Sequence, residues 1–218
     1  MRFAALDGWR GICAMGVVLF HAGGPIAWSG GHLALLREGN LFVDYFFVLS
    51  GFVMGYTYDD RIVDMQSAGL FMIRRFGRLW PLHAVVLALY VALELVALVI
   101  EGHLGNFAAH PAFTYDKTPG SLLTNLLLIH SLGIHDHFTW NTPSWSISVE
   151  FWTYVVFAGM LVMAERHRGM IAVGIAGFGA AGIAISGRYM AATFDYGILR
   201  CLYGFFLGYL VFRLCLPA

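Results

Sequence analysis

Two polar side chains, Arg10 and His21, interrupt the first apolar stretch of the chain, residues 8–28. Eleven steps of an α-helix make about three full turns and rise about 16 Å, so both side chains project from one helical face. Facing lipid would cost such a group about 2.5 kcal/mol or more, so this face is expected to border protein or a water-filled cavity. An imidazole in such a place can act as general base or nucleophile, whereas a structural His21 would only hydrogen-bond a neighbouring helix.

Three arginines, Arg74, Arg75 and Arg78, form a second candidate group. Spacings of three and four residues bring their side chains together on a helix. A guanidinium group pairs with two phosphate oxygens at once, so the cluster could hold a phosphorylated ligand at the inner membrane surface. The alternative is that these arginines only anchor the helix to anionic lipid headgroups.

A carboxylate, Glu150, lies about two turns inside the apolar segment that begins near Ser144, and Ser146 lies one turn before it. A buried glutamate must be protonated or paired, and either state can bind a hydroxyl substrate. Structural pairing with an arginine of another helix is the alternative.

Ser50 and Gly51 interrupt a large aromatic surface on the segment 41–57. A glycine there lets a ligand chain or another backbone approach closely, and ordinary helix packing explains the pair equally well.

The remaining histidines give weaker signals. His135 and His137 are spaced like a metal-ligand pair, but two histidines on a loop are mostly solvated, and no metal site is predicted. The sequence has no glycine-rich dinucleotide motif, no phosphate-binding loop of NTPases and no HExxH zinc motif. We expect no bound cofactor.

The composition is that of a membrane protein. Of 218 residues, 59% are hydrophobic and 12% charged, against about 25% charged in soluble domains. Thirteen basic and thirteen acidic residues cancel, so no basic field exists to attract nucleic acid, which is excluded as a partner. The predicted fold is all-α, a polytopic transmembrane helix bundle in contact with membrane lipid.

Apolar stretches near the 20 residues that cross a bilayer predict about seven transmembrane helices. They are residues 8–28, 41–57, 79–100, 121–134, 144–164, 170–186 and 197–216. The fourth is short and contains His130, so it could be a partial or re-entrant helix. In that case every later segment reverses its direction across the membrane.

Arginines near the helix ends predict a multi-pass protein of the cell (inner) membrane with a cytoplasmic N-terminus. Arg2 and Arg10 precede or open the first segment, and further arginines lie between the second and third. The loop 165–168 conflicts with this pattern, since its two arginines would face outside if the fourth segment crossed the membrane.

Taken in order along the chain, several of these stretches resemble motifs of the integral-membrane acyltransferase 3 family. They are residues 6–11, His21, 46–52, 74–81 and 145–151, and the resemblance spans residues 3 to 157. Each motif is weak alone, but together and in this order they are highly specific. The resemblance implies that Arg10 and His21 are the family's arginine–histidine pair, and that Arg75 and Arg78 are its cytoplasmic arginine motif.

The resemblance also implies a function: transfer of an acyl group, most often acetyl, from acetyl-CoA to a hydroxyl of a polysaccharide, lipopolysaccharide O-antigen or glycolipid. The catalytic residues would be His21, Arg10 and Glu150. The donor would be bound by Arg74, Arg75 and Arg78, with Ser50 and Gly51 lining the acyl channel.

The domain is expected to cover residues 1–218 as a single acyltransferase 3 domain, incomplete at its C-terminus, because family members usually have about ten transmembrane helices. The rival function is a transporter or flippase of a glycan or lipid intermediate, since buried charges also mark substrate pathways. A haem-binding electron carrier using His21, His83 or His130 is a third possibility.

Overall fold

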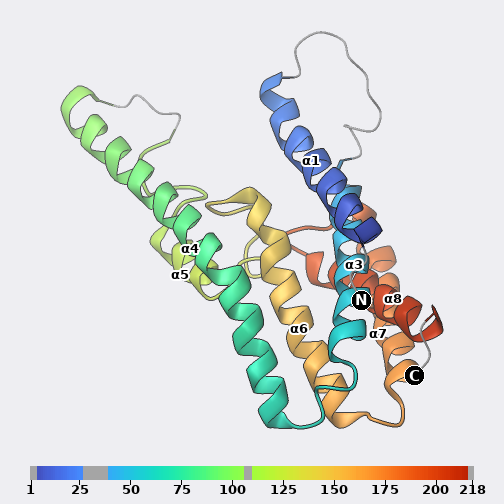
Figure 1. Cartoon of the computed structure of the whole chain (residues 1–218). Helices are drawn as coiled ribbons and strands as arrows, with labels where there is room; N and C mark the ends of the chain where they lie inside the picture. Colours follow the sequence, from blue (N-terminus) through green and yellow to red (C-terminus); the bar gives the residue numbers. More distant parts are fainter. Residues whose placement is uncertain (1–3, 27–38, 106–109, 216–218) are drawn as a thin grey trace.

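The computed structural model describes residues 4–26, 39–105 and 110–215, and every regular element in those ranges is a helix (Figure 1). The helices are α1 (Ala4–Ile26), α3 (Leu41–Tyr58), α4 (Met65–Leu104), α5 (Pro119–Leu126), α6 (Trp145–Met163), α7 (Arg168–Ser186) and α8 (Gly197–Cys215). Two short 3₁₀ turns, η1 (Thr142–Ser144) and η2 (Tyr189–Ala191), precede α6 and α8. The predicted all-α class is confirmed.

Five helical stretches of the described chain are long and apolar enough to cross a membrane. They are Leu41–Tyr58, Met65–His103, Thr142–Met163, Arg168–Ser186 and Gly197–Cys215. Four of them agree, apart from their end residues, with the predicted segments 41–57, 144–164, 170–186 and 197–216. The first predicted segment corresponds to α1, which begins at Ala4 rather than residue 8; predicted residues 27 and 28 lie outside the described ranges.

The fourth predicted segment, 121–134, does not form a membrane-spanning helix. Only the eight residues of α5 are helical there, about 12 Å of helix against about 30 Å of hydrocarbon. Leu128, just past the end of α5, has a φ of 55°, in the left-handed region where a helix cannot continue. The alternative of a partial helix is therefore the one that the structure adopts.

The direction of α8 is consistent with a fourth segment that does not cross the membrane. α8 runs parallel to α3, because Asp44 near the start of α3 pairs with Arg200 near the start of α8, and Asp59 beyond the end of α3 pairs with Arg213. Parallel helices need an odd number of crossings between them, which α4, α6 and α7 supply without α5. The loop 164–167 then lies at the same end as residues 59–64, and Arg168 donates to the carbonyl oxygen of Asp59 over 2.8 Å. The arginines of the loop 165–168 therefore no longer conflict with the predicted orientation, because the fourth segment does not cross the membrane.

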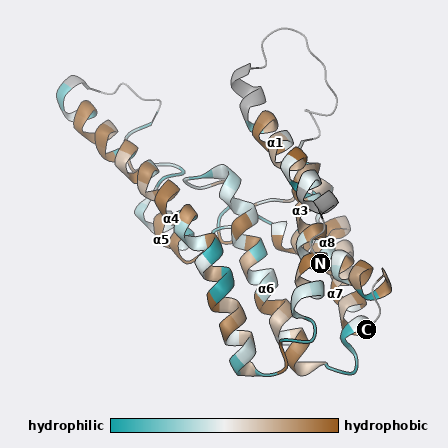
Figure 2. Cartoon of the chain, viewed as in Figure 1, coloured by the Kyte–Doolittle hydropathy of each residue, from teal (hydrophilic) through white to brown (hydrophobic). Residues whose placement is uncertain are grey.

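The third predicted segment, 79–100, is part of a longer helix. α4 has 40 residues and starts at a capping box, in which the Asp64 side chain accepts from the backbone N–H of Ser67. Arg75 therefore lies about 15 Å along the helix and Arg78 about 20 Å. Figure 2 shows this hydrophilic stretch of α4 with apolar turns on both sides. The arginines are thus positioned by the helix itself rather than by the loop before it.

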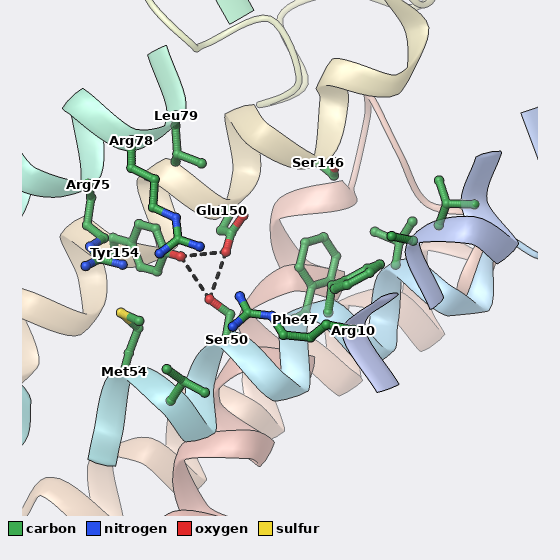
Figure 3. A pocket seen from close by; sticks show the side chains of 15 residues that line it. Arg10, Phe47, Ser50, Met54, Arg75, Arg78, Leu79, Ser146, Glu150 and Tyr154 are labelled. Carbon is green, nitrogen blue, oxygen red and sulfur yellow. Dashed lines mark hydrogen bonds between the residues drawn. The ribbon is translucent and has the colours of Figure 1, made fainter. Parts of the chain in front are cut away.

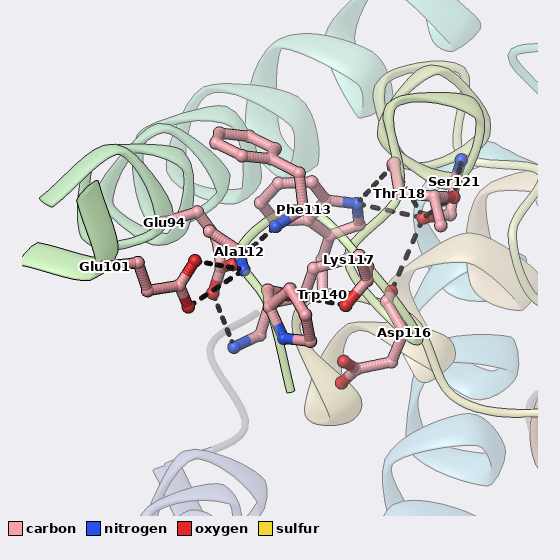
Figure 4. A network of polar contacts seen from close by, with 11 residues as sticks. Glu94, Glu101, Ala112, Phe113, Asp116, Lys117, Thr118, Ser121 and Trp140 are labelled. Carbon is pink, nitrogen blue, oxygen red and sulfur yellow. Dashed lines mark hydrogen bonds and ion pairs between the residues drawn. The ribbon is translucent and has the colours of Figure 1, made fainter. Parts of the chain in front are cut away.

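The far end of α4 is tied to the connection that follows it (Figure 4). Glu94 pairs with the Lys117 ammonium group over 2.8 Å and accepts the backbone N–H of Phe113 over 3.0 Å. Both carboxylate oxygens of Glu101 accept the backbone N–H of Ala112. The hydrogen bond that Lys117 donates to Glu94 raises the pKa of the Lys117 amine. Residues 112–118 are therefore fastened to α4.

The core forms where α3 crosses α8, and glycines set the distance between the two backbones. A Cβ added at Gly51 would lie 1.8 Å from the carbonyl oxygen of Phe205, and one at Gly208 would lie 1.8 Å from that of Val48. Only residues without a side chain permit this contact. Phe157 and Phe206 are fully buried around it.

Ion pairs fasten α3 to α8 on both sides of this crossing. Arg200 is 1% exposed; its Nε and Nη2 donate to the two carboxylate oxygens of Asp44 over 2.7 and 2.6 Å. At the other end Asp59 accepts from Tyr209 over 2.6 Å and from Arg213 over 2.9 Å. The buried Arg200 and Asp59 are thus each paired with an opposite charge, as a low-dielectric interior requires.

Candidate active site

Side chains of α1, α3, α4 and α6 enclose a cavity of about 390 Å³ (Figure 3). Its polar lining consists of Arg10, Ser50, Arg75, Arg78, Ser146, Glu150 and Tyr154. Its apolar lining consists of Ala14, Val17, Val43, Phe46, Phe47, Val53, Met54 and Leu79. We call it the arginine cavity.

Three of its polar side chains form a hydrogen-bonded group. Glu150 and Tyr154 lie one turn apart on α6, and the Tyr154 hydroxyl donates to Glu150 Oε1 over 2.5 Å. Ser50 of α3 donates to the same oxygen over 2.8 Å, and its hydroxyl lies 2.9 Å from that of Tyr154. Two hydroxyl groups thus share one carboxylate oxygen, which fixes the position of Glu150 within the cavity.

The cavity is rich in positive charge. Arg75 is buried, its Nη2 donates to the Tyr58 hydroxyl over 3.0 Å, and its guanidinium carbon lies 5.3 Å from the Tyr58 ring centroid. Its buried Nε has no partner among the described residues. Arg10 and Arg78 point toward the hydroxyl–carboxylate group from opposite sides in Figure 3. Three guanidinium groups and one carboxylate line this cavity, so it has a surplus of positive charge that suits an anionic ligand.

His21 lies in an adjoining cavity of about 620 Å³, between α1, the start of α3, η1 and the segment 188–195. We call it the histidine cavity. Val17 and Val43 line both cavities, so the two spaces share a wall. Four of the lining residues on α1, namely Arg10, Ala14, Val17 and His21, follow one another at helical spacings of four, three and four. Arg10 and His21 therefore share one face of α1, as their spacing predicts.

The structure brings five of the eight predicted site residues into the arginine cavity, places His21 in the adjoining cavity, and separates the other two from both. Arg74 is exposed and lines neither of these cavities. Gly51 faces α8, where it makes the close backbone contact described above. The five that line the arginine cavity together are Arg10, Ser50, Arg75, Arg78 and Glu150.

Sequence reasoning missed two residues of this region. Tyr154 carried a readable signal, since it follows Glu150, a carboxylate within an apolar segment, by one helical turn. Arg200 lines the histidine cavity and is an arginine inside an apolar segment, the same signal that singled out Arg10. Its partner is Asp44, whose carboxylate oxygen lies 2.6 Å from the guanidinium nitrogen.

Comparisons with known proteins agree with this picture. Residues 3–214 match the family model described as an acyltransferase domain. The chain is 30% identical over 166 residues to acyltransferase MdmB of Streptomyces mycarofaciens, covering 72% of this chain and 38% of that protein. It is 30% identical over 161 residues to "Protein 2 in picA locus" of Rhizobium radiobacter, covering 72% and 81%.

A third relative, named as a membrane-bound transacylase, BcsY of Komagataeibacter xylinus, is 29% identical over 220 residues, covering 97% of this chain and 51% of that protein. The chain thus spans about half or less of the length of two of these relatives. No solved structure gives a significant match.

Proposed function

The chain belongs to the acyltransferase family whose domain it matches over residues 3–214, and from this premise we propose that it transfers an acetyl group from acetyl-CoA to a carbohydrate hydroxyl. Acceptors of the expected class are polysaccharides, lipopolysaccharide O-antigen and glycolipids. Membrane lipid surrounds the helices, and five of the described stretches are apolar enough to cross it.

The observation that carries this proposal is the pair of adjoining cavities on one face of α1. Arg10, Arg75 and Arg78 supply positive charge for the donor phosphates. The apolar lining beyond them, including Val17 and Val43, suits the uncharged arm that carries the thioester. Arg10 and His21 are about 16 Å apart along the helix, a distance that separates the charged end of such a donor from its reactive end.

His21 is proposed to carry out the chemistry in one of two ways. As a general base, it takes the proton of the acceptor hydroxyl while that oxygen attacks the thioester carbonyl and the CoA thiolate leaves. As a nucleophile, its ring nitrogen first takes the acyl group and expels the thiolate, and the acceptor oxygen then displaces the imidazole. A trapped acyl-imidazole would distinguish the second route from the first.

Arg10 and Glu150 are assigned to the donor side because both line the arginine cavity, whereas His21 lines the next one. Arg10 binds a donor oxygen, and Glu150 accepts hydrogen bonds from the amide groups of the donor arm. Ser50 and Tyr154 hold Glu150 in place for this purpose.

We further propose that the chain lies in the inner membrane with its N-terminus in the cytoplasm. Arg61, Arg166 and Arg168 lie in or beside the loops at one end of the bundle, together with Arg213 in the last turn of α8. A bundle end rich in arginine is the one that remains in the cytoplasm. Acetyl-CoA would then enter the arginine cavity from that side.

The test uses membranes that contain the chain, labelled acetyl-CoA and candidate glycans. Replacing His21 by alanine is expected to abolish label transfer while the protein stays inserted and still binds the donor. His167→Ala is the matched control, because His167 is exposed and lies in the loop before α7, outside both cavities. Near-normal turnover in His21→Ala would remove the catalytic role of this residue.

A further inference from the structure

The histidine cavity has a polar wall that the donor does not need. Across from His21, the lining residues include Asn40, Thr142, Arg188 and Asp195. None of them belongs to the arginine cavity. This wall is therefore separate from the groups assigned to acetyl-CoA.

The carboxylate of the charged pair in this wall is held in a fixed position. Arg188 Nε lies 3.1 Å from Asp195 Oδ2, while Asp195 Oδ1 accepts the backbone N–H groups of Thr193 and Tyr196 over 3.1 and 2.8 Å. The carboxylate is 17% exposed and the arginine side chain 59% exposed. In the described part of the chain no partner is recorded for the Nη groups of Arg188, which leaves donors that a ligand hydroxyl can accept from.

The wall is supported from behind by a buried cation. Arg200 donates to the carbonyl oxygens of Ala192 and Asn40 over 3.1 and 3.0 Å, and Asp44 neutralises it. The Asn40 amide also donates to the carbonyl oxygen of Met190 over 3.3 Å. The segment that carries Arg188 and Asp195 is thereby tied to the start of α3, so its polar groups are positioned before a ligand arrives.

Aromatic rings form much of the remaining wall. The rings of Phe138 and Phe194 pack edge to face with their centroids 4.8 Å apart, and Phe20 and Trp145 also line the cavity. Flat apolar rings beside a hydroxyl-binding charge pair suit a ligand with apolar faces and polar edges. A sugar ring has both.

We propose that the histidine cavity is the acceptor subsite, in which Arg188 and Asp195 bind sugar hydroxyls next to the one that is acylated. This assignment rests on the proposed acyl transfer. In the step itself the acceptor oxygen bonds to the acyl carbon, the bond from that carbon to sulfur or to the imidazole nitrogen breaks, and the hydroxyl proton goes to a ring nitrogen of His21. Arg188 and Asp195 do not take part in bond making; they position the acceptor.

The test measures acetyl transfer from labelled acetyl-CoA to p-nitrophenyl β-D-glucopyranoside in membranes that contain the full chain. Arg188→Gln and Asp195→Asn are each expected to raise the KM for the glucoside about tenfold, the loss of one charge-assisted hydrogen bond. The KM for acetyl-CoA is expected to stay unchanged. Arg166→Gln is the control, since Arg166 is an exposed arginine outside both cavities.

The outcomes separate this inference from the proposed function. If the wild type transfers label and both variants keep its glucoside KM, the acceptor subsite is refuted and the transferase remains. If the wild type binds acetyl-CoA but never acetylates the glucoside, the assignment of this cavity to a sugar fails. If the wild type neither binds acetyl-CoA nor transfers label, the proposed function itself fails.

Discussion

Replacing Gly51 by alanine is the sharpest test of how packing positions the arginine cavity. The new methyl carbon would stand 1.8 Å from the carbonyl oxygen of Phe205, while ordinary contact begins near 3.4 Å. The obstacle is backbone, which cannot rotate away, so α3 and α8 must separate by about 1.5 Å. Overpacking of this kind costs about 1–3 kcal/mol or more.

The same displacement reaches the site through the neighbouring residue. Ser50 donates to Glu150 over 2.8 Å, and a shift of about 1.5 Å exceeds the range of a hydrogen bond. We therefore expect Gly51→Ala to lower thermal stability and also to weaken acetyl-CoA binding. Tryptophan fluorescence during heating in detergent measures the first, and equilibrium binding of labelled acetyl-CoA to membranes measures the second.

Gly174→Ala is the matched control, because no atom lies within 4 Å of the Cβ that alanine would add there. Removing a glycine from an exposed position on α7 is expected to leave donor binding unchanged and to raise stability by up to about 1 kcal/mol. If Gly51→Ala melts and binds acetyl-CoA like the wild type, the close contact between α3 and α8 does not exist in the protein.

Two further predictions follow from individual side chains. Tyr154→Phe removes the hydroxyl that bonds Glu150 and Ser50 but keeps the buried ring. Donor affinity, measured by binding of labelled acetyl-CoA, is therefore expected to fall about tenfold, with little change in melting temperature. An unchanged affinity would show that this hydrogen-bonded group does not shape the site. Burial and the nearby His83 lower the pKa of His130 from 6.5 to about 4, so the folded protein keeps this ring neutral while the unfolded chain takes up a proton below pH 6.5. Stability is then fully present above pH 6.5 and falls by up to about 3 kcal/mol as the pH drops toward 4. Thermal melts between pH 7 and 4 measure this, and His130→Gln should show a shallower decline; equal slopes would contradict it.

Local periodicity is what made parts of this molecule predictable. Arg10 and His21 share a face because the helix repeat alone decides it, and the structure places Ala14 and Val17 between them. The start of α4 was missed because Arg74, Arg75 and Arg78 interrupt the apolar stretch in a hydropathy profile, although Asp64 is a good helix cap.

Contacts between distant segments could not be predicted in the same way. Ser50 and Tyr154 are 104 residues apart, and Asp44 and Arg200 are 156 apart. The direction of every helix after α5 depends on whether residues 121–134 cross the membrane. The helix ends just before Leu128, which has a left-handed backbone conformation, and leucine is not a residue type that predicts such a turn.

The parallel pairing of α3 and α8 has a consequence for the C-terminal helix. Asp44 with Arg200, the backbone contact at Gly51, and Asp59 with Arg213 hold the two helices at three heights. Such a three-point attachment forbids sliding and rotation, so α8 sets the depth of Ser50 in the membrane without placing any atom in the arginine cavity. A chain shortened before residue 197 would keep His21 and every arginine of that cavity, but it would lose α8, the helix that fixes the position of α3 relative to them.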